Sequence, residues 1–305
     1  MKVTKCTLAQ FKKDFGSEEQ CMEYLQHQKW QSGYQCRKCG GTASKKGDRV
    51  FDKRCKKCGY NESPLAHTIF HGLKFSLATA FEMVYRISVN KKGVSSIALC
   101  REFGVNLKTA YNFKRKVQYA MKSSGNHPLG GMVHVDEFVI GGPEEGKKGR
   151  SIDTEKKKIC IAVEIIENQH SSEKTIGNAY AISIENYSAN ELTKLFEKHI
   201  DEQATIQTDE WKGYNPLKKH YNITQVKSEQ GRNFPQLHLL IMNIKSWIRG
   251  IHHSVSKNHI QRYLDEFFFR FNRRKWIDRI PILLLNKMIK TDKIIVKSTI
   301  GGFYG

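Results

Sequence analysis

The sequence lacks the long apolar runs that membrane insertion or secretion requires. Nowhere do eighteen apolar residues follow one another, and residues 1–15 are mixed and charged, with no continuous apolar segment. Internal repeats and low-complexity tracts are also absent. We therefore expect neither a membrane protein nor a secreted one.

Acidic residues are scarce relative to basic ones. The 305 residues include 51 Lys and Arg but only 30 Asp and Glu, so the formal net charge is +21. Residues 1–135 hold 24 basic and 9 acidic residues, or +15, which leaves +6 for residues 136–305. Such an excess attracts phosphate backbones, so DNA or RNA is the predicted partner. A solvated basic surface that aids solubility is the alternative.

Cysteine is present, but not in the pattern of a disulfide framework. Four cysteines are scattered without regular spacing and are expected to be reduced thiols in a cytoplasmic protein: Cys6, Cys21, Cys100 and Cys160. The others form two Cys-x-x-Cys pairs with fifteen residues between them, and these are Cys36, Cys39, Cys55 and Cys58. This spacing predicts a structural zinc ribbon closed by four thiolates, with unpaired reduced thiols as the alternative. The intervening segment is strongly basic.

Helical periodicity dominates the first 121 residues outside the ribbon. We expect amphipathic helical structure over 7–30 and helices over 75–89, 95–103 and 107–121. Gly104 separates the last two, so they form a helix-turn-helix pattern, although any two helices joined by a glycine turn look alike. The second helix carries side chains able to contact bases and phosphates: Lys108, Thr109, Tyr111, Asn112, Lys114 and Arg115.

A polar linker at residues 123–131 precedes a change of pattern. Strand patterns cover 132–140, 159–166, 179–184 and 205–208, and helical patterns cover 189–200, 234–249 and 257–273. The order predicts an α/β domain in which helices flank a mixed sheet. With 39% hydrophobic residues, the chain has enough apolar material for two or three domain cores.

Two carboxylates lie within or directly after predicted strands, where a charged side chain is unusual. Asp136 lies within the apolar strand 132–140, and Asp209 follows the strand 205–208 directly. If these strands are neighbours, the carboxylates converge, and hard oxygen ligands of this kind select Mg²⁺ or Mn²⁺. Either residue alone is a weak signal, because an Asp at a strand end is commonly a turn former or a helix cap.

With these motifs in place, the chain resembles insertion-sequence transposases that join an N-terminal zinc ribbon and a helix-turn-helix to an RNase-H-like catalytic domain of the DDE type. The resemblance covers most of the chain and rests on the two Cys pairs, the helix-turn-helix and five short segments: Thr68-Ile69-Phe70-His71-Gly72, Asn90-Lys91-Lys92-Gly93, His134-Val135-Asp136-Glu137 with Gly141-Gly142, Thr208 to Tyr214, and Tyr263 to Phe267 with Arg270 to Arg274.

The resemblance implies a domain order and a function. Zinc ribbon, helix-turn-helix, catalytic domain and tail are expected over 1–65, 66–125, 130–290 and 291–305. Such an enzyme binds the terminal inverted repeats of its element and, with Mg²⁺ or Mn²⁺, cleaves the ends and joins the 3′-OH to target DNA. It implies a bacterial or archaeal cytoplasm and at least a dimer on paired ends, and it makes Asp136 and Asp209 the first two acidic positions.

The third acidic position departs from the simplest family pattern. The family places a Glu on a late helix with Lys or Arg seven residues later, and here that spacing falls on His238 and Lys245. Some relatives similarly use His or Asn, so we expect His238 to help hold the metal, the alternative being a polar residue at the edge of an apolar stripe. Glu266 is the rival third carboxylate, although an i,i+4 pair with Arg270 is the favoured role. A second DNA surface is expected at Arg270, Arg273 and Arg274.

Two other functions compete with the transposase. A zinc-ribbon regulator, or a decayed transposase, would bind DNA without cutting it, and His238 in place of glutamate favours this alternative. An RNase-H-like nuclease of another kind would leave the helix-turn-helix unexplained. The sequence does not decide between cut-and-paste and copying transposition.

Overall fold

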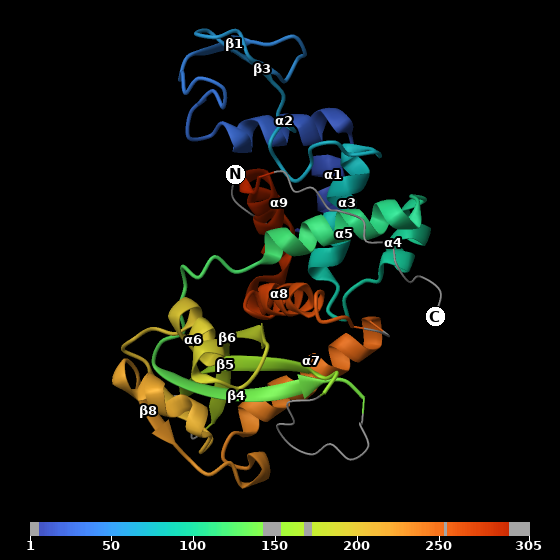
Figure 1. Cartoon of the computed structure of the whole chain (residues 1–305). Coiled ribbons are helices and arrows are strands. Elements are labelled where there is room, and N and C mark those ends of the chain that lie inside the picture. The colour runs from blue at the N-terminus through green and yellow to red at the C-terminus, as the bar shows by residue number, and fades with distance from the viewer. Residues whose placement is uncertain (1–5, 143–153, 168–172, 253–254, 293–305) are drawn as a thin grey trace. The chain divides into compact units, whose positions relative to one another are not determined.

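The computed structural model describes residues 6–142, 154–167, 173–252 and 255–292. It divides the chain into two compact units (Figure 1). Unit 1 combines residues 1–121 with 276–305, and unit 2 comprises residues 122–275. Among the described residues, no helix is both long and apolar enough to cross a bilayer.

Unit 1 is mainly helical. Its helices are α1 (Leu8–Phe15), α2 (Glu18–Lys29), α3 (Leu77–Val89), α4 (Ser96–Phe103), α5 (Leu107–Met121) and α9 (Ile280–Lys290). The helical stretch expected over 7–30 is two helices, because Ser17 accepts a hydrogen bond from the backbone N–H of Gln20 while the Gln20 side chain accepts one from Ser17 N–H. This reciprocal cap begins a new helix directly after the first ends at Gly16.

The helices α4 and α5 lie where the sequence predicted them and contact each other. Gly104 ends α4 in the left-handed conformation, with φ of +64°, which a glycine adopts without the steric cost that a side chain would add. The side chain of Ser95 caps the other end of α4 by accepting a hydrogen bond from the backbone of Ala98. The two helices and their glycine turn therefore exist as a packed pair.

The C-terminal boundary of unit 2 differs from the one predicted for the catalytic domain. We expected the catalytic domain to reach residue 290, but unit 2 ends at Lys275 and α9 packs in unit 1 against α2, α3 and α5. Leu284 and Leu285 of α9 are fully buried, and the Tyr24 hydroxyl donates a 2.7 Å hydrogen bond to Asn286. In the sequence, unit 2 thus lies between α5 and α9. The predicted tail lies outside the described residues from 293 onward.

The cysteine-rich part of unit 1 contains a small antiparallel sheet. Its strands are β1 (Ser44–Lys46), β2 (Lys53–Cys55) and β3 (Asn61–Glu62), in the order β1-β2-β3. Lys29 Nζ at the end of α2 lies 2.7 Å from Oε1 of the buried Glu62 and donates to the carbonyls of Ser63 and Ala66. This buried ion pair connects α2 to the sheet.

Unit 2 is built on a five-stranded mixed sheet in the order β6-β5-β4-β7-β8. The strands are β4 (Met132–Ile140), β5 (Lys157–Glu167), β6 (Lys174–Ile184), β7 (Thr205–Thr208) and β8 (Asn222–Gln225). β4, β5 and β6 pair antiparallel, whereas β7 and β8 run parallel to β4. The sequence did not predict β8, a four-residue edge strand whose one apolar residue is Ile223.

Helices cover both faces of this sheet, which confirms the predicted α/β layering. The helices are α6 (Ala189–His199), α7 (Pro235–Ile251) and α8 (Ile260–Phe271), with the short 3-10 turns η1 (Lys212–Lys219) and η2 (Glu229–Gly231). A third such turn, η3 (Arg274–Arg279), spans the boundary in sequence between the two units. Phe138 of β4 packs in the core beneath α7 and α8, whereas Val133 and Val135 pack in the core beneath α6 and η1. Because side chains alternate along a strand, Asp136 shares the α7 face and Glu137 the opposite face.

Candidate zinc centre and acidic active site

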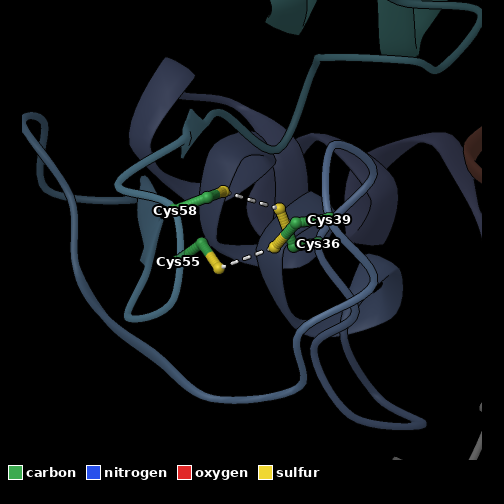
Figure 2. A group of neighbouring side chains, drawn as sticks. All are labelled: Cys36, Cys39, Cys55 and Cys58. Carbon is green, nitrogen blue, oxygen red and sulfur yellow. Dashed lines mark hydrogen bonds between the residues drawn. The ribbon is translucent and has the colours of Figure 1, made fainter.

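The four paired cysteines come together in unit 1. Figure 2 shows their sulfurs directed toward one another, with Cys36 Sγ 3.6 Å from Cys58 Sγ and Cys39 Sγ 3.6 Å from Cys55 Sγ. All four sulfurs lie within 4.8 Å of one another. A tetrahedral ion with Zn–S bonds of 2.3 Å requires S···S distances of about 3.8 Å, so the cluster fits such an ion.

Two matching loops place the sulfurs. In the first, Gly40 N–H donates to Cys36 O and Cys36 N–H to Gly41 O, and in the second, Gly59 N–H donates to Cys55 O and Cys55 N–H to Tyr60 O. Both Gly40 and Gly59 have φ near +70°, a conformation that favours glycine. The repeated sequence Cys-x-x-Cys-Gly therefore encodes the same turn twice.

The surroundings of Cys36 favour a thiolate. Burial raises its pKa, but hydrogen bonds from the backbone N–H groups of Cys39 and Lys38, together with those to the Cys58 and Cys39 side chains, lower the pKa to about 6. In the same cluster, the backbone N–H of Gly41 lowers the pKa of Cys39, but the neighbouring sulfurs raise it to about 12, so Cys36 is the favoured thiolate of the two. Trp30 and Tyr34 pack against Cys36 and Cys55. A thiolate is the form in which cysteine binds metal.

The acidic site of unit 2 follows from strand pairing. Val135 of β4 lies opposite Thr208 of the parallel strand β7, so the next residues along, Asp136 and Asp209, are neighbours. The carboxylate oxygens of Asp136, Glu137 and Asp209 lie within 4.8 Å of one another. The predicted convergence of Asp136 and Asp209 is present, and Glu137 joins them. Three carboxylates so close repel one another unless a cation lies between them, so the oxygen-only set fits Mg²⁺ or Mn²⁺.

The loop after β7 fixes Asp209. Its Oδ1 accepts a 3.0 Å hydrogen bond from the backbone N–H of Trp211, and its backbone carbonyl accepts one from the Gln225 side chain. Asp136 Oδ1 likewise accepts a 2.7 Å hydrogen bond from the Glu137 backbone N–H. Both carboxylates therefore have one oxygen oriented by the backbone.

His238 reaches the same site from the first turn of α7. Its Nε2 lies 3.8 Å from Asp136 Oδ2, and burial followed by the charge of Lys245 lowers the pKa of the imidazole. The ring leans against Gly231, where an added methyl group would come within 2.7 Å of His238 Cδ2. Gly231 also has φ of +89°. The turn η2 therefore supports the ring directly.

Lys245 lies two helical turns after His238 and on the same side of α7. Its Nζ is 5.6 Å from the centre of the Phe138 ring. Burial lowers the pKa of Lys245, and the nearby charge of Asp136 acts in the opposite direction. The spacing of seven residues thus brings both side chains toward Asp136.

Glu266 and Arg270 lie neither on the surface nor at the acidic site. Glu266 is fully buried, and its Oε1 lies 3.5 Å from Nη2 of Arg270, whose guanidinium covers the Trp247 ring. This is the i,i+4 pair that the sequence favoured for Glu266. The predicted DNA contact of Arg270 is wrong, because its side chain is only 10% exposed inside that pair.

The predicted DNA-binding residues of α5 separate into two groups. Lys108 is exposed, and Thr109, Tyr111, Asn112 and Arg115 are half-buried. Lys114 is buried, and its Nζ donates a 2.6 Å hydrogen bond to the Val94 carbonyl ahead of α4. The DNA contact predicted for Lys114 is therefore wrong: this lysine connects α5 to the segment before α4.

Two arginines that follow α8 remain available to solvent. Arg274 is exposed and Arg273 is half-buried. Each lies over a phenylalanine ring, Arg273 over Phe269 at 4.1 Å and Arg274 over Phe271 at 4.0 Å. They can present positive charge while their stems pack on apolar surface.

Sequence reasoning did not select Glu137. Glu137 belongs to the motif around Asp136, but strand alternation directs consecutive side chains to opposite faces and so argues against a shared site. In the structure, carboxylates from both faces of β4 nevertheless meet Asp209, just beyond the end of β7. The adjacent acidic pair in an apolar strand was the available signal.

Comparison with protein families agrees with both sites. Residues 128–272 match the ISXO2-like transposase domain, and residues 16–61 match the transposase zinc-ribbon domain. The first match covers the acidic site and defines the class as a transposase. Together they place the chain in the family of insertion-sequence transposases with an N-terminal zinc ribbon. No curated protein matches the chain.

Proposed function

We propose that the protein binds the terminal inverted repeats of an insertion sequence and catalyses divalent-cation-dependent DNA cleavage and strand transfer. The observation that carries this proposal is the convergence of the Asp136 and Asp209 carboxylates beside His238, in a domain of the transposase family. The sheet order and the helices on both faces support an RNase-H-like fold for unit 2.

Asp136 and Asp209 would hold the Mg²⁺ or Mn²⁺ ions. Such ions, when bound, activate the attacking oxygen of water or of a 3′-OH and stabilise the leaving oxygen. His238 would help hold or orient an ion through its imidazole, 3.8 Å from Asp136. Lys245, on the same side of α7, would pair with a substrate phosphate and neutralise charge that develops on it.

Recognition of the DNA ends is assigned to unit 1. The ribbon exposes basic side chains around the cysteine cluster, which would hold a structural Zn²⁺: Arg37, Lys38, Lys45, Lys46, Arg49, Lys56 and Lys57. Lys108, Thr109, Tyr111, Asn112 and Arg115 of α5 would contact DNA as the second helix of a helix-turn-helix. In unit 2, Arg273 and Arg274 would contact transposon or target DNA. Paired ends would require at least a dimer.

A nicking and joining assay tests the proposal. The zinc-loaded protein is incubated with a duplex that carries its candidate terminal repeat, with Mg²⁺ or Mn²⁺. Asp136→Asn and Asp209→Asn should abolish cleavage and retain end binding, because each keeps the shape of the side chain and removes a ligand charge. Strand transfer retained in either variant would contradict the assignment.

Two further variants test the third position. His238→Ala should lose cleavage, whereas cleavage that survives in His238→Ala would remove the histidine from the metal site. Glu266→Gln should lower the stability of unit 2 more than it lowers the rate of cleavage, because Glu266 lies with Arg270 in a buried pair.

A DNA-binding protein without cleavage activity is the second candidate, and the histidine at position 238 is the observation that favours it. Such a protein would bind the repeat in a salt-sensitive manner and produce no nicks with either cation. The same assay therefore separates the two functions.

A further inference from the structure

Glu137 occupies a position that the two-aspartate description of the site does not use. It follows Asp136 in β4 and lies opposite Cys160 of β5, on the face of the sheet that packs against α6 and η1. Its carboxylate nevertheless comes within 4.8 Å of those of both Asp136 and Asp209. We propose that Glu137 is the third carboxylate of the active site and a ligand of the divalent cation held by Asp136 and Asp209. This inference rests on the proposed function.

The charge of the site supports a third carboxylate. Two divalent cations carry +4, which Asp136 and Asp209 offset by only −2, and the imidazole of His238 has no negative form that would add to this. Glu137 raises the offset to −3. This is the charge that the simplest family pattern provides, with two aspartates and a glutamate on the late helix. The glutamate missing from α7 is thus replaced in charge by one on β4, on the opposite face from His238.

The other acidic candidate does not serve this role. Glu266 is fully buried in α8, its Oε1 lies beside Arg270, and it is not among the carboxylates that gather at Asp136 within the described residues. Glu137, Asp136 and Asp209 are all partly exposed residues, although Oε1 of Glu137 is itself buried.

A purely structural role for Glu137 would involve Tyr214. This tyrosine of η1 is fully buried, and burial, the Cys160 thiol and the charge of Glu137 raise its pKa, so its hydroxyl stays protonated beside the carboxylate. Tyr214→Phe removes the hydroxyl alone and so tests whether Glu137 acts only by pairing with this tyrosine.

Direct titration of Mn²⁺ into the full-length, zinc-loaded protein, without DNA, tests the assignment. Free Mn²⁺ is followed by electron paramagnetic resonance, so the result does not depend on activity. Glu137→Gln should weaken Mn²⁺ binding at least tenfold, whereas Tyr214→Phe should weaken it less. Binding by Glu137→Gln equal to wild type would overturn the proposal, as would equal losses in Glu137→Gln and Tyr214→Phe.

Asp136→Asn separates this inference from the proposed function. If Asp136→Asn loses Mn²⁺ binding and Glu137→Gln does not, only the role of Glu137 fails. If wild type itself binds no Mn²⁺, both fail. Should Glu137→Gln not fold, Glu137→Asp provides the same test, because it keeps the charge and withdraws the oxygens by one methylene: a tenfold loss supports the assignment and unchanged binding overturns it.

Discussion

The two candidate metal sites are assembled in different ways. The cysteine cluster of unit 1 is built from two copies of one local turn, so its four ligands fall within residues 36–58. The acidic site of unit 2 collects side chains from β4, the end of β7 and the first turn of α7, a span from residue 136 to residue 238. One site is encoded by loop sequence and the other by the pairing of strands.

The difference teaches what holds each site in place. A ribbon with three short strands has little apolar core of its own, so its metal is expected to supply much of its stability. The acidic site lies on a five-stranded sheet covered on both faces, so its geometry should persist without metal. The following four experiments, each a substitution with its control, test this contrast between the two units.

Removal of zinc is expected to have the largest effect. Binding of structural zinc contributes apparent free energies of about 10–16 kcal/mol in small zinc domains. Cys55→Ser should therefore unfold the ribbon and leave unit 2 folded, as measured by hydrogen exchange across both units. Cys100→Ser, outside the cluster, is the control. Protected ribbon amides in Cys55→Ser would show that the ribbon does not depend on the ion.

A core substitution in α9 sharpens the contrast, because unit 1 also depends on a segment distant in sequence. Leu284 is fully buried and its neighbour Leu283 is 45% exposed. Leu284→Ala should lower the free energy of unfolding of unit 1 by about 2–5 kcal/mol, and Leu283→Ala should change it by less than about 0.5 kcal/mol. Chemical denaturation measures the free energy of unfolding of both variants. Similar losses in the two would contradict the packing of Leu284 in the core of unit 1.

Gly231→Ala probes the long-range assembly of unit 2. The added methyl group would meet the His238 ring at 2.7 Å, so the ring must move, and a displacement near 1 Å can reduce catalysis about a hundredfold. Gly131→Ala is the matched control, since Gly131 also has positive φ but has no atom within 4 Å of the added group. Equal cleavage rates for the two variants would argue against a role for the His238 position.

The smallest effects are expected on the surface of α5. Lys108→Ala should weaken DNA binding for all sequences alike and reduce the salt dependence of log K by about 1, because Lys108 is exposed. Lys114→Met should instead lower stability and leave the salt dependence unchanged, since Lys114 bonds the Val94 carbonyl inside unit 1. Binding titrations over a range of salt concentrations distinguish them. A weaker dependence of log K on salt concentration for Lys114→Met would show that Lys114 contacts DNA after all.

Local signals were sufficient for much of the fold. The strands 132–140 and 205–208 have their predicted bounds. The edge strand β8 and the packing of α9 were missed, since each depends on contacts with residues far away in sequence. Asp136 and Asp209 were predicted to meet only if their strands were adjacent, and the sheet order fulfils that condition. Charge alone did not show that Lys114 and Arg270 are buried.

The most direct test of the two-site description is a crystal of the protein soaked with Mn²⁺, measured by anomalous X-ray scattering at the zinc and manganese absorption edges. We expect a zinc peak among Cys36, Cys39, Cys55 and Cys58, and a manganese peak between Asp136 and Asp209 with Glu137 and His238 beside it. No manganese at Asp136 and Asp209, or zinc bound at that site instead, would contradict the assignment of unit 2 as a cation-dependent catalytic domain.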